Sequence, residues 1–102
     1  MARQVNWTET ALSDLEQAAE YIARDSPSYA TSSVRRAFAA AASLDEFAQR
    51  GRVVPELGDT SIREIIVGSY RLIYRTAGDT VHIIAFVHGA RDLPRLWEED
   101  DR

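Results

Sequence analysis

The hydrophobic period of the sequence changes near residue 50, and this change limits the folds open to the chain more than any other feature. Before that point apolar residues recur every three or four positions, as on one face of a helix. Beyond it they alternate with polar residues in three short stretches, 61–67, 70–76 and 80–88, as in half-buried strands. The sequence therefore predicts two helices followed by three antiparallel strands.

A break at Ser26 and Pro27 separates the two expected helices. Thr8 is a suitable N-cap for a first helix over about residues 9–24. Ser26 is a suitable N-cap for a second helix, which has Pro27 in its first position and continues to Gly51. The predicted core faces are Leu12, Leu15, Ala19 and Ile22 in the first helix, and Ala30, Val34, Phe38, Ala41, Leu44 and Phe47 in the second. With so short a turn between them, the helices must pack antiparallel.

Each strand divides its side chains between the two faces of the sheet. In the middle strand the two sets are Tyr70, Leu72 and Tyr74, and Arg71, Ile73 and Arg75. In the last strand they are Val81, Ile83, Ala85 and Val87, and His82, Ile84, Phe86 and His88. If the register brings His82, Ile84, Phe86 and His88 onto the face that carries Arg71 and Arg75, an exposed binding surface results. The alternative is that a C-terminal turn over residues 92–97, or a second copy of the chain, covers this face.

These elements make a single α+β domain over residues 1–97, followed by an acidic C-terminal tail over 98–102. We expect the order β-α-α-β-β-β, with the two-helix hairpin packed on one face of a small, mostly antiparallel sheet. The short apolar start at residues 5–7 supplies the first strand, which lies at an edge of the sheet or pairs inside it. The 102 residues contain no cysteine, and no apolar run approaches the roughly 20 residues of a membrane span. We therefore expect a cytoplasmic protein without membrane contact, and the lack of phosphate-loop, dinucleotide and zinc motifs predicts no cofactor and no metal.

Polar residues gather near the predicted sheet, although no standard catalytic motif is present. RNA can be cleaved by attack of its own 2′-hydroxyl group, and this reaction needs a base, an acid and cations. Side chains of these kinds are present in Glu56, Arg71, Arg75, His88 and Arg91. A carboxylate or imidazole would take the hydroxyl proton, an acid would protonate the leaving oxygen, and guanidinium groups would stabilise the phosphorane. The alternative is structural: Arg71 and Glu56 form an ion pair on the rim, and so do Arg63 and Glu64. All twelve basic residues are arginine, which excludes any mechanism that needs lysine.

Several short motifs follow one another in order along nearly the whole chain. They are Asp14-Leu15 to Tyr21-Ile22, Gly51-Arg52-x-x-Pro55-Glu56, Arg63-Glu64 with Val67, Tyr70-Arg71-x-x-Tyr74, and His88-Gly89-Ala90-Arg91. With these motifs in this order the sequence resembles the RelE/ParE superfamily of toxins from type II toxin–antitoxin systems. The resemblance implies a growth-inhibiting toxin that is held inactive by a cognate antitoxin, whose extended or helical segment wraps around it.

The resemblance leaves three functions open. The ending His88-Gly89-Ala90-Arg91 and the long helical hairpin are similar to the ParE branch, whose members act on DNA gyrase, and we favour this branch. The second function is ribosome-dependent mRNA cleavage of the RelE or YoeB type. Similarity to the YoeB-like nucleases implies catalytic roles for Glu56, Arg71 and His88, whereas the lysine-containing RelE site cannot be present in that form. The third is an inert or repurposed interaction module.

The surface expected to bind the antitoxin or the target combines the open face of the sheet with the helical hairpin. Its candidate residues are Leu15, Arg63, Arg71, Arg75, Phe86 and Arg91. The formal net charge of −4 disfavours DNA binding by this chain alone, so operator binding would belong to the antitoxin.

Overall fold

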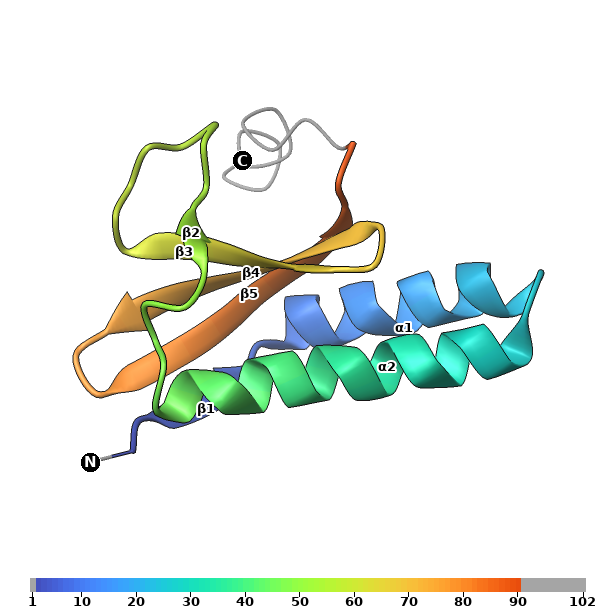
Figure 1. Ribbon diagram of the computed structural model, residues 1–102, viewed down its shortest axis with the longest axis horizontal. Coiled ribbons are helices and arrows are strands. Elements are labelled where there is room, and N and C mark those ends of the chain that lie inside the picture. The colour runs from blue at the N-terminus through green and yellow to red at the C-terminus, as the bar shows by residue number, and fades with distance from the viewer. Residues whose placement is uncertain (1, 91–102) are drawn as a thin grey trace.

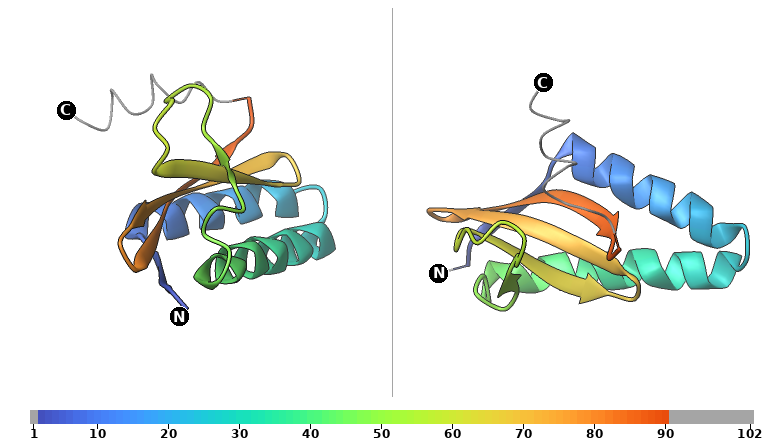
Figure 2. Two further views of the ribbon diagram at one scale, coloured as in Figure 1. Left: turned by 60° about the vertical axis from the view of Figure 1, so that its left-hand side comes forward. Right: turned by 90° about the horizontal axis from the view of Figure 1, so that it is seen from above.

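The computed structural model describes residues 2–90, in which a helical hairpin covers one face of a sheet (Figure 1). In chain order the elements are β1 (Gln4–Trp7), α1 (Glu9–Ala23), α2 (Pro27–Ala42), the 3₁₀ helix η1 (Ser43–Asp45), β2 (Arg52–Val53), β3 (Ile62–Val67), β4 (Tyr70–Ala77) and β5 (Thr80–His88). Both helices lie on the same side of the sheet, and the connection from β2 to β3 lies on the other (Figure 2). The predicted α+β architecture is confirmed.

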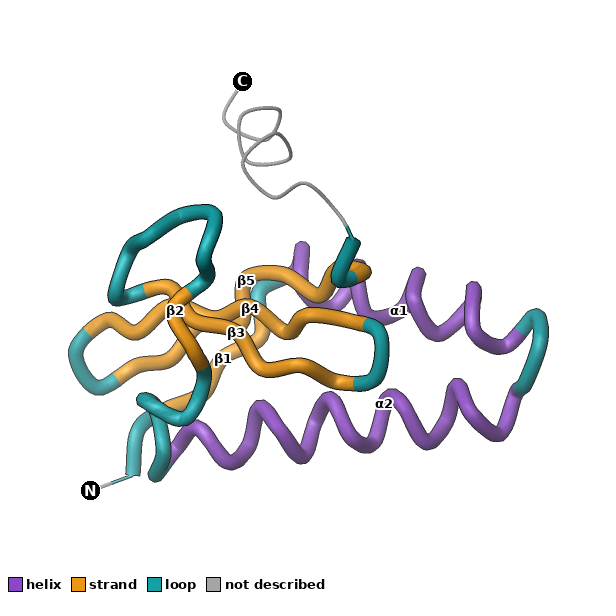
Figure 3. The backbone as a smooth tube through the Cα atoms, turned by 45° about the horizontal axis from the view of Figure 1, so that its top comes forward, coloured by secondary structure: helices purple, strands orange, loops and turns teal. Residues whose placement is uncertain are grey.

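Both helices begin at the capping residues that the sequence predicts. The Thr8 hydroxyl accepts a hydrogen bond from the Ala11 N–H at 3.1 Å at the start of α1. The Ser26 hydroxyl accepts one from the Tyr29 N–H at 3.2 Å at the start of α2. The first residue of α2 is a proline, whose missing N–H would have no partner inside the helix. These local interactions fix the short turn and make the two helices run side by side (Figure 3).

The sheet has the strand order β1-β5-β4-β3-β2. β1 lies at one edge, parallel to β5, which is one of the two positions expected for it. The other neighbours are antiparallel, and the two-residue strand β2 pairs with Arg63 and Glu64 at the opposite edge. β5 and β4 therefore occupy inner positions, which suits their largely apolar side chains.

The main core lies between the helices and the sheet. The sheet contributes Leu72, Tyr74, Val81, Ile83 and Phe86, and the helical layer contributes Ala11, Leu15, Ala18, Ala37, Ala41 and Leu44. The small alanine side chains let the helices lie close to the strands. The buried Tyr74 hydroxyl donates to the Ala48 carbonyl at 2.8 Å and accepts from the Gly51 N–H at 2.9 Å. This pair of hydrogen bonds ties the chain that follows η1 to the middle of the sheet.

The second helix is shorter than predicted. It ends at Ala42, and η1 takes the place of the expected continuation to Gly51. The Ser43 hydroxyl donates to the Ala40 carbonyl at 2.6 Å, which satisfies a carbonyl group near the helix end. Phe38 and Phe47, expected in the core, are 44% and 61% exposed. No helix within residues 2–90 has the length and apolar character needed to cross a membrane.

The buried stripe of α1 is also displaced from the predicted one. It consists of Ala11, Leu15 and Ala18, whereas Leu12 is 44% exposed. Alanines at positions 11 and 18 allow α1 to approach the sheet closely. The helix therefore turns the face with these small side chains toward the sheet. The apolar period therefore predicts the helix and the burial of Leu15 correctly, but Leu12 is exposed and Ala11 and Ala18 complete the buried face.

A β-bulge changes which side chains of β5 face the helices. The register shifts between Ile73 and Tyr74, because Ile73 lies opposite Ala85 but Tyr74 lies opposite Ile83. Ile84 is thus an extra residue in β5, and side chains after it change faces. Phe86 consequently joins the core on the helix side. The register that would bring Phe86 and His88 onto the face of Arg71, left open by the sequence, is therefore not the one that the sheet adopts.

Candidate functional site

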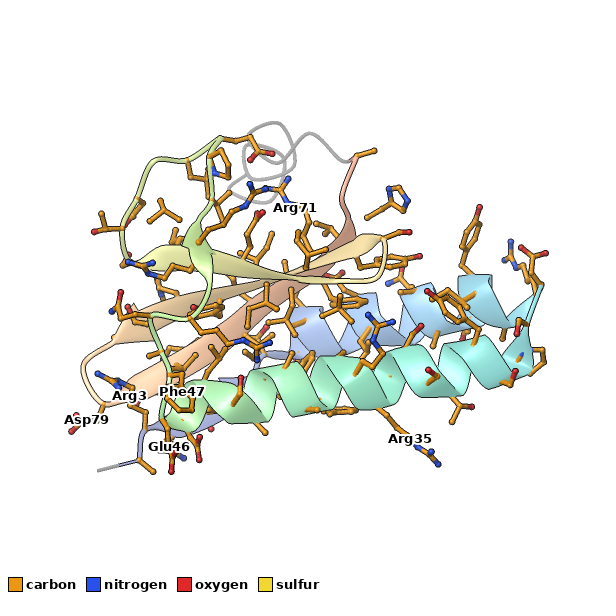
Figure 4. The ribbon with its side chains drawn as sticks, in the orientation of Figure 1. Arg3, Arg35, Glu46, Phe47, Arg71 and Asp79 are labelled. Atoms are coloured by element: carbon orange, nitrogen blue, oxygen red, sulfur yellow. The ribbon has the colours of Figure 1, made fainter. Side chains whose placement is uncertain are left out.

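Arg71 is the centre of a cluster of charged residues on the face of the sheet opposite the helices (Figure 4). Its neighbour in β4, Leu72, points into the helix-side core, so alternation turns Arg71 to the other face. Arg71 is only 4% exposed, which is uncommon for an arginine and requires that its charge be paired. The cluster contains Arg52 from β2, Glu56 from the following turn, Glu64 from β3 and Arg71 from β4.

Arg71 is held by two carboxylates. Its Nη1 and Nη2 atoms donate to the two carboxylate oxygens of Glu56 at 2.6 and 2.8 Å, which is a bidentate pair. Its Nε atom donates to Glu64 at 2.8 Å, and Nη2 donates to the same Glu64 oxygen. Four of the five guanidinium N–H groups are therefore engaged. The other oxygen of Glu64 accepts from Arg52, so the cluster is a continuous chain of four alternating charges.

A tight turn brings Glu56 over the sheet. The N–H groups of Leu57 and Gly58 both donate to the Val54 carbonyl at 3.1 Å, and Gly58 has a positive φ of 64°. Val54 is fully buried against Ile73, so the turn is anchored on β4. This turn therefore covers part of the face that was expected to be open. The two coverings considered from the sequence were a C-terminal turn over residues 92–97 and a second copy of the chain, and neither is this segment.

The ion pair changes the acid–base properties of Glu56. Its hydrogen bonds to Arg71 lower the pKa of Glu56 to about 2, against the opposing effect of partial desolvation. The same pairing raises the pKa of Arg71 above its ordinary value. At neutral pH Glu56 is ionised and bound, so it has no proton to donate and is a weak base. A phosphate group would have to displace Glu56 to reach the Arg71 guanidinium.

His88 lies on the other face of the sheet. It is directly opposite Tyr70, whose ring it meets edge-on with centroids 5.5 Å apart. Its Nδ1 atom accepts a hydrogen bond from the Ala90 N–H at 3.2 Å. It lines a hollow of about 220 Å³ between the β3–β4 turn and the helical hairpin. The structure therefore brings Glu56 and Arg71 together and separates His88 from both.

The remaining predicted surface residues have different environments. Leu15 and Phe86 are 5% and 3% exposed, so both are core residues that a partner does not reach in this structure. Arg75 is exposed on β4. Arg63 turns to the helix side, donates from Nη1 to the Gly51 carbonyl at 2.9 Å, and has a buried Nε atom without a partner among the described residues. Arg91 and the predicted turn over 92–97 lie outside the described residues, as does the tail over 98–102.

Glu64 is the cluster residue whose role sequence reasoning missed. The sequence suggested that it pairs with its neighbour Arg63, but adjacent residues of a strand point to opposite faces. The two-residue turn after Val67 pairs Ile66 with Arg71 and places Glu64 diagonally across from that arginine on the same face. The short turn at Gly68 and Ser69 is visible in the sequence. It fixes the register of the two strands, so it could have identified the Glu64–Arg71 pair.

Comparison with known proteins places this geometry in a family. Residues 5–93 match the family described as ParE toxin of type II toxin-antitoxin system, parDE. A curated relative, Toxin RelE2 of Caulobacter vibrioides, is 39% identical over 89 residues, which are 86% of this chain and 97% of the relative.

Two solved structures share the fold. One is a chain of the chromosomal ParDE system of P. aeruginosa, with a TM-score of 0.69, 19% identity, and coverage of 85% of this chain and 96% of that one. The other is a chain of the toxin-antitoxin complex RelBE2 of Mycobacterium tuberculosis, with a TM-score of 0.56, 25% identity, and coverage of 86% and 99%.

Proposed function

This chain belongs to the ParE toxin family of type II toxin–antitoxin systems, and from that membership we propose that it arrests growth by acting on DNA gyrase without cleaving RNA. It is a toxin with a cognate antitoxin as its partner, in keeping with the toxin–antitoxin systems to which the relatives of this fold belong. The target within the cell is the part that we infer.

The pairing of Arg71 carries this proposal. Cleavage of RNA needs a base, an acid and a cation close to one phosphate. In this chain Glu56 is held by Arg71 with a pKa of about 2, and His88 lies on the opposite face. Inhibition of gyrase by binding needs no proton transfer, so this arrangement supports a toxin that acts by contact.

The test uses one preparation in two assays. Purified protein is incubated with gyrase, ATP and relaxed plasmid, and in parallel with ribosomes that carry an mRNA. We expect loss of supercoiling or trapped double-strand breaks, with the mRNA intact. Cleaved mRNA with unaffected gyrase would overturn the proposal, and no effect in either assay would favour an inert or repurposed module.

Two variants separate contact from catalysis. Glu56→Gln and His88→Gln remove the carboxylate and the imidazole that the resemblance to the nucleases implicates, and both residues are exposed enough for the fold to be retained. A contact inhibitor should keep its activity within about twofold in each variant, whereas a nuclease should lose about 10²–10⁴-fold. Circular dichroism and thermal unfolding serve as the check that each variant is folded.

Cleavage of mRNA on the ribosome is the second candidate. It is favoured by the position of the Glu56–Arg71 pair, since the Glu56 side chain is 31% exposed and a phosphate group could replace it on Arg71. In that case Glu64 would continue to orient the guanidinium. The mRNA assay above decides this, and a cleavage activity abolished by Glu56→Gln would establish it.

A further inference from the structure

Two hollows of different chemistry adjoin along one side of α2. The first is the hollow of about 220 Å³ beside His88, which Tyr29 of α2 also lines, and we call it the tyrosine hollow. The second, of about 290 Å³, is lined by Arg36 of α2 and by Arg50, and we call it the arginine hollow. Val67 of β3 lines both. The two hollows are therefore placed to hold different parts of one elongated small molecule.

The side chains of Tyr29 and Arg36 come together at the turn between β3 and β4. Gly68 in this turn has a positive φ of 61°, and a Cβ atom at this position would lie 3.3 Å from the Tyr29 Oη atom and 3.9 Å from the Arg36 Nη1 atom. Both side chains thus reach the same point, although their positions on α2 are about two turns, or about 10 Å, apart. The tyrosine hollow therefore continues into the arginine hollow, with Arg36 at the junction.

The arginine hollow carries positive charge that no carboxylate of its surroundings neutralises. Its described lining contains no acidic residue, and neither Arg36 nor Arg50 forms a salt bridge within residues 2–90. Arg50 is positioned by a hydrogen bond from its Nη1 atom to the Ser43 hydroxyl at 2.6 Å. Arg63, which donates to the Gly51 carbonyl next to Arg50, adds a further cation beside them. Guanidinium groups bind phosphate oxygens in a bidentate manner, so this hollow suits phosphate groups.

Two exposed tyrosines give the tyrosine hollow its aromatic walls. Tyr21 is 63% exposed and Tyr29 47%, and both line the hollow. Their rings present apolar surface that a planar ring would cover by stacking. The Arg24 guanidinium already lies over the Tyr21 ring, 5.8 Å from its centroid, so Tyr29 is the better stacking partner for a ligand.

Polar groups of the tyrosine hollow match the edge of a nucleobase. The Asp25 carboxylate is an acceptor. His88 is a donor, because its Nδ1 atom accepts from the Ala90 N–H and the neutral imidazole then carries its proton on Nε2. Ser33 is 8% exposed, and its hydroxyl group has no hydrogen-bond partner within residues 2–90. A base with both N–H groups and acceptor atoms can satisfy all three.

We propose that the two hollows form a nucleotide site, with the base against Tyr29 in the tyrosine hollow and the phosphate groups on Arg36 and Arg50. A nucleotide combines a planar, hydrogen-bonding ring with anionic groups at a distance set by the ribose, as the separate aromatic and basic linings require. A single nucleotide is favoured over an RNA chain, because the net charge of −4 disfavours a long phosphate backbone. Nucleotide binding goes beyond the proposed function, since inhibition of gyrase by contact does not need it.

The first experiment is calorimetric titration of the protein with three probes. GDP carries phosphates and a base that has both N–H donors and acceptors, pyrophosphate carries the phosphates alone, and guanosine carries the base and ribose alone. We expect GDP to bind at least about tenfold more tightly than either fragment, because one molecule occupies both hollows. Pyrophosphate that binds as tightly as GDP would overturn the proposal, and so would the absence of GDP binding at about 1 mM.

The second experiment removes the two cations. Arg36→Gln and Arg50→Gln should each weaken the binding of GDP and of pyrophosphate by about tenfold and leave that of guanosine unchanged. The matched control is Arg35→Gln, since Arg35 is an exposed arginine of the same helix that points away from the sheet (Figure 4). It should change the affinities by less than about twofold. An equal loss in Arg35→Gln would show that only the net charge of the chain matters, and would overturn the site.

The third experiment removes the stacking surface. Tyr29→Leu should weaken the binding of GDP by about tenfold and leave that of pyrophosphate unchanged. The control is Phe47→Leu, because Phe47 is an aromatic residue with 61% exposure that lines neither hollow. Both side chains are exposed, so both variants should fold, and thermal unfolding checks this. Unchanged GDP binding in Tyr29→Leu would exclude the base from this hollow.

A short single-stranded RNA completes the set of probes, because it presents the same bases and phosphates in a polymer. RNA that binds more tightly than GDP and loses affinity in the same variants would overturn the assignment to a single nucleotide. GDP binding that exceeds that of RNA, is lost in the site variants and is kept in both controls supports it. None of these outcomes depends on the gyrase or mRNA assay, so this inference and the proposed function can fail separately.

Discussion

The two faces of the sheet are buried in different ways. On the helix side, apolar strand residues such as Leu72 and Ile83 pack against a helical layer rich in alanine. On the other side, a single turn covers Val54 and Ile73, and the charged cluster of Arg52, Glu56, Glu64 and Arg71 lies beside them. One face is apolar and covered by regular elements, whereas the other combines four charges with a small apolar cluster under a turn.

This difference determines how each face tolerates change. Apolar packing depends on volume and shape, so a truncation costs what the removed methyl groups and the cavity contribute. A buried charge depends on its partner, and removing that partner leaves the full desolvation cost without compensation. Substitutions on the two faces should therefore act through cavity volume on one and through unpaired charge on the other.

Glu64→Ala should have the largest effect. Glu64 is 2% exposed and joins Arg71 to Arg52, so its removal takes one of the two carboxylates away from a buried guanidinium. We expect a loss of about 3–5 kcal/mol in the free energy of unfolding, measured by urea denaturation. Glu46→Ala, which removes an exposed carboxylate, serves as the control and should change it by less than about 0.5 kcal/mol. A cost for Glu64→Ala below about 1 kcal/mol would show that the cluster does not support the fold.

Leu72→Ala should rank second and act by another mechanism. Leu72 is fully buried between β4 and the helices, and we expect a loss of about 2–4 kcal/mol in the free energy of unfolding. The matched control is Leu12→Ala, because Leu12 is 44% exposed on α1, and its cost should stay below about 1 kcal/mol. Equal costs for the two leucines would contradict the position assigned to the core. High salt should leave the effect of Leu72→Ala unchanged.

The order of elements could be predicted from the sequence because its signals are local. Thr8 and Ser26 cap the helices through contacts with residues three positions away, and the period of the apolar residues distinguishes helix from strand. The buried face of α1 was predicted only in part, because its position depends on how closely Ala11 and Ala18 let the helix approach the sheet. The side of Phe86 was missed because one extra residue, Ile84, turns every later side chain of β5 to the other face.

The candidate site was predicted in part for similar reasons. The Arg71–Glu56 pair was anticipated as a structural alternative, but on the rim of the domain. The burial of this ion pair depends on the turn that packs Val54 on Ile73, and no local sequence pattern predicts that contact. The separation of His88 from Arg71 follows from the same bulge that moved Phe86. Sequence reasoning thus anticipated that Arg71 and Glu56 pair, but neither where the pair lies nor that Glu64 belongs to it.

The pH dependence of stability should isolate Glu56. Its pKa is about 2 in the folded chain against 4.5 ordinarily, so its contribution is complete above about pH 4.5 and is lost as the pH falls toward 2. The full shift corresponds to about 3 kcal/mol, and exposure of the side chain reduces the expected contribution to about 1–2 kcal/mol. The difference in unfolding free energy between the original chain and Glu56→Gln should therefore shrink between pH 5 and pH 2.5. A difference that stays constant over this range would exclude the ionic contribution.

Arg52→Gln should have the smallest effect, and it compares two arginines on one carboxylate. Arg52 and Arg71 both bind Glu64, but the Arg52 side chain is 63% exposed and the Arg71 side chain 5%. We expect Arg52→Gln to lower the free energy of unfolding by about 0.5–1 kcal/mol, because solvent already screens its charge and Arg71 continues to satisfy Glu64. Urea denaturation at about 1 M salt should reduce that loss further, since exposed charges are screened most strongly. A loss as large as that of Glu64→Ala would mean that the exposed arginine, rather than the buried one, sustains Glu64, and that the charged face is organised from its rim.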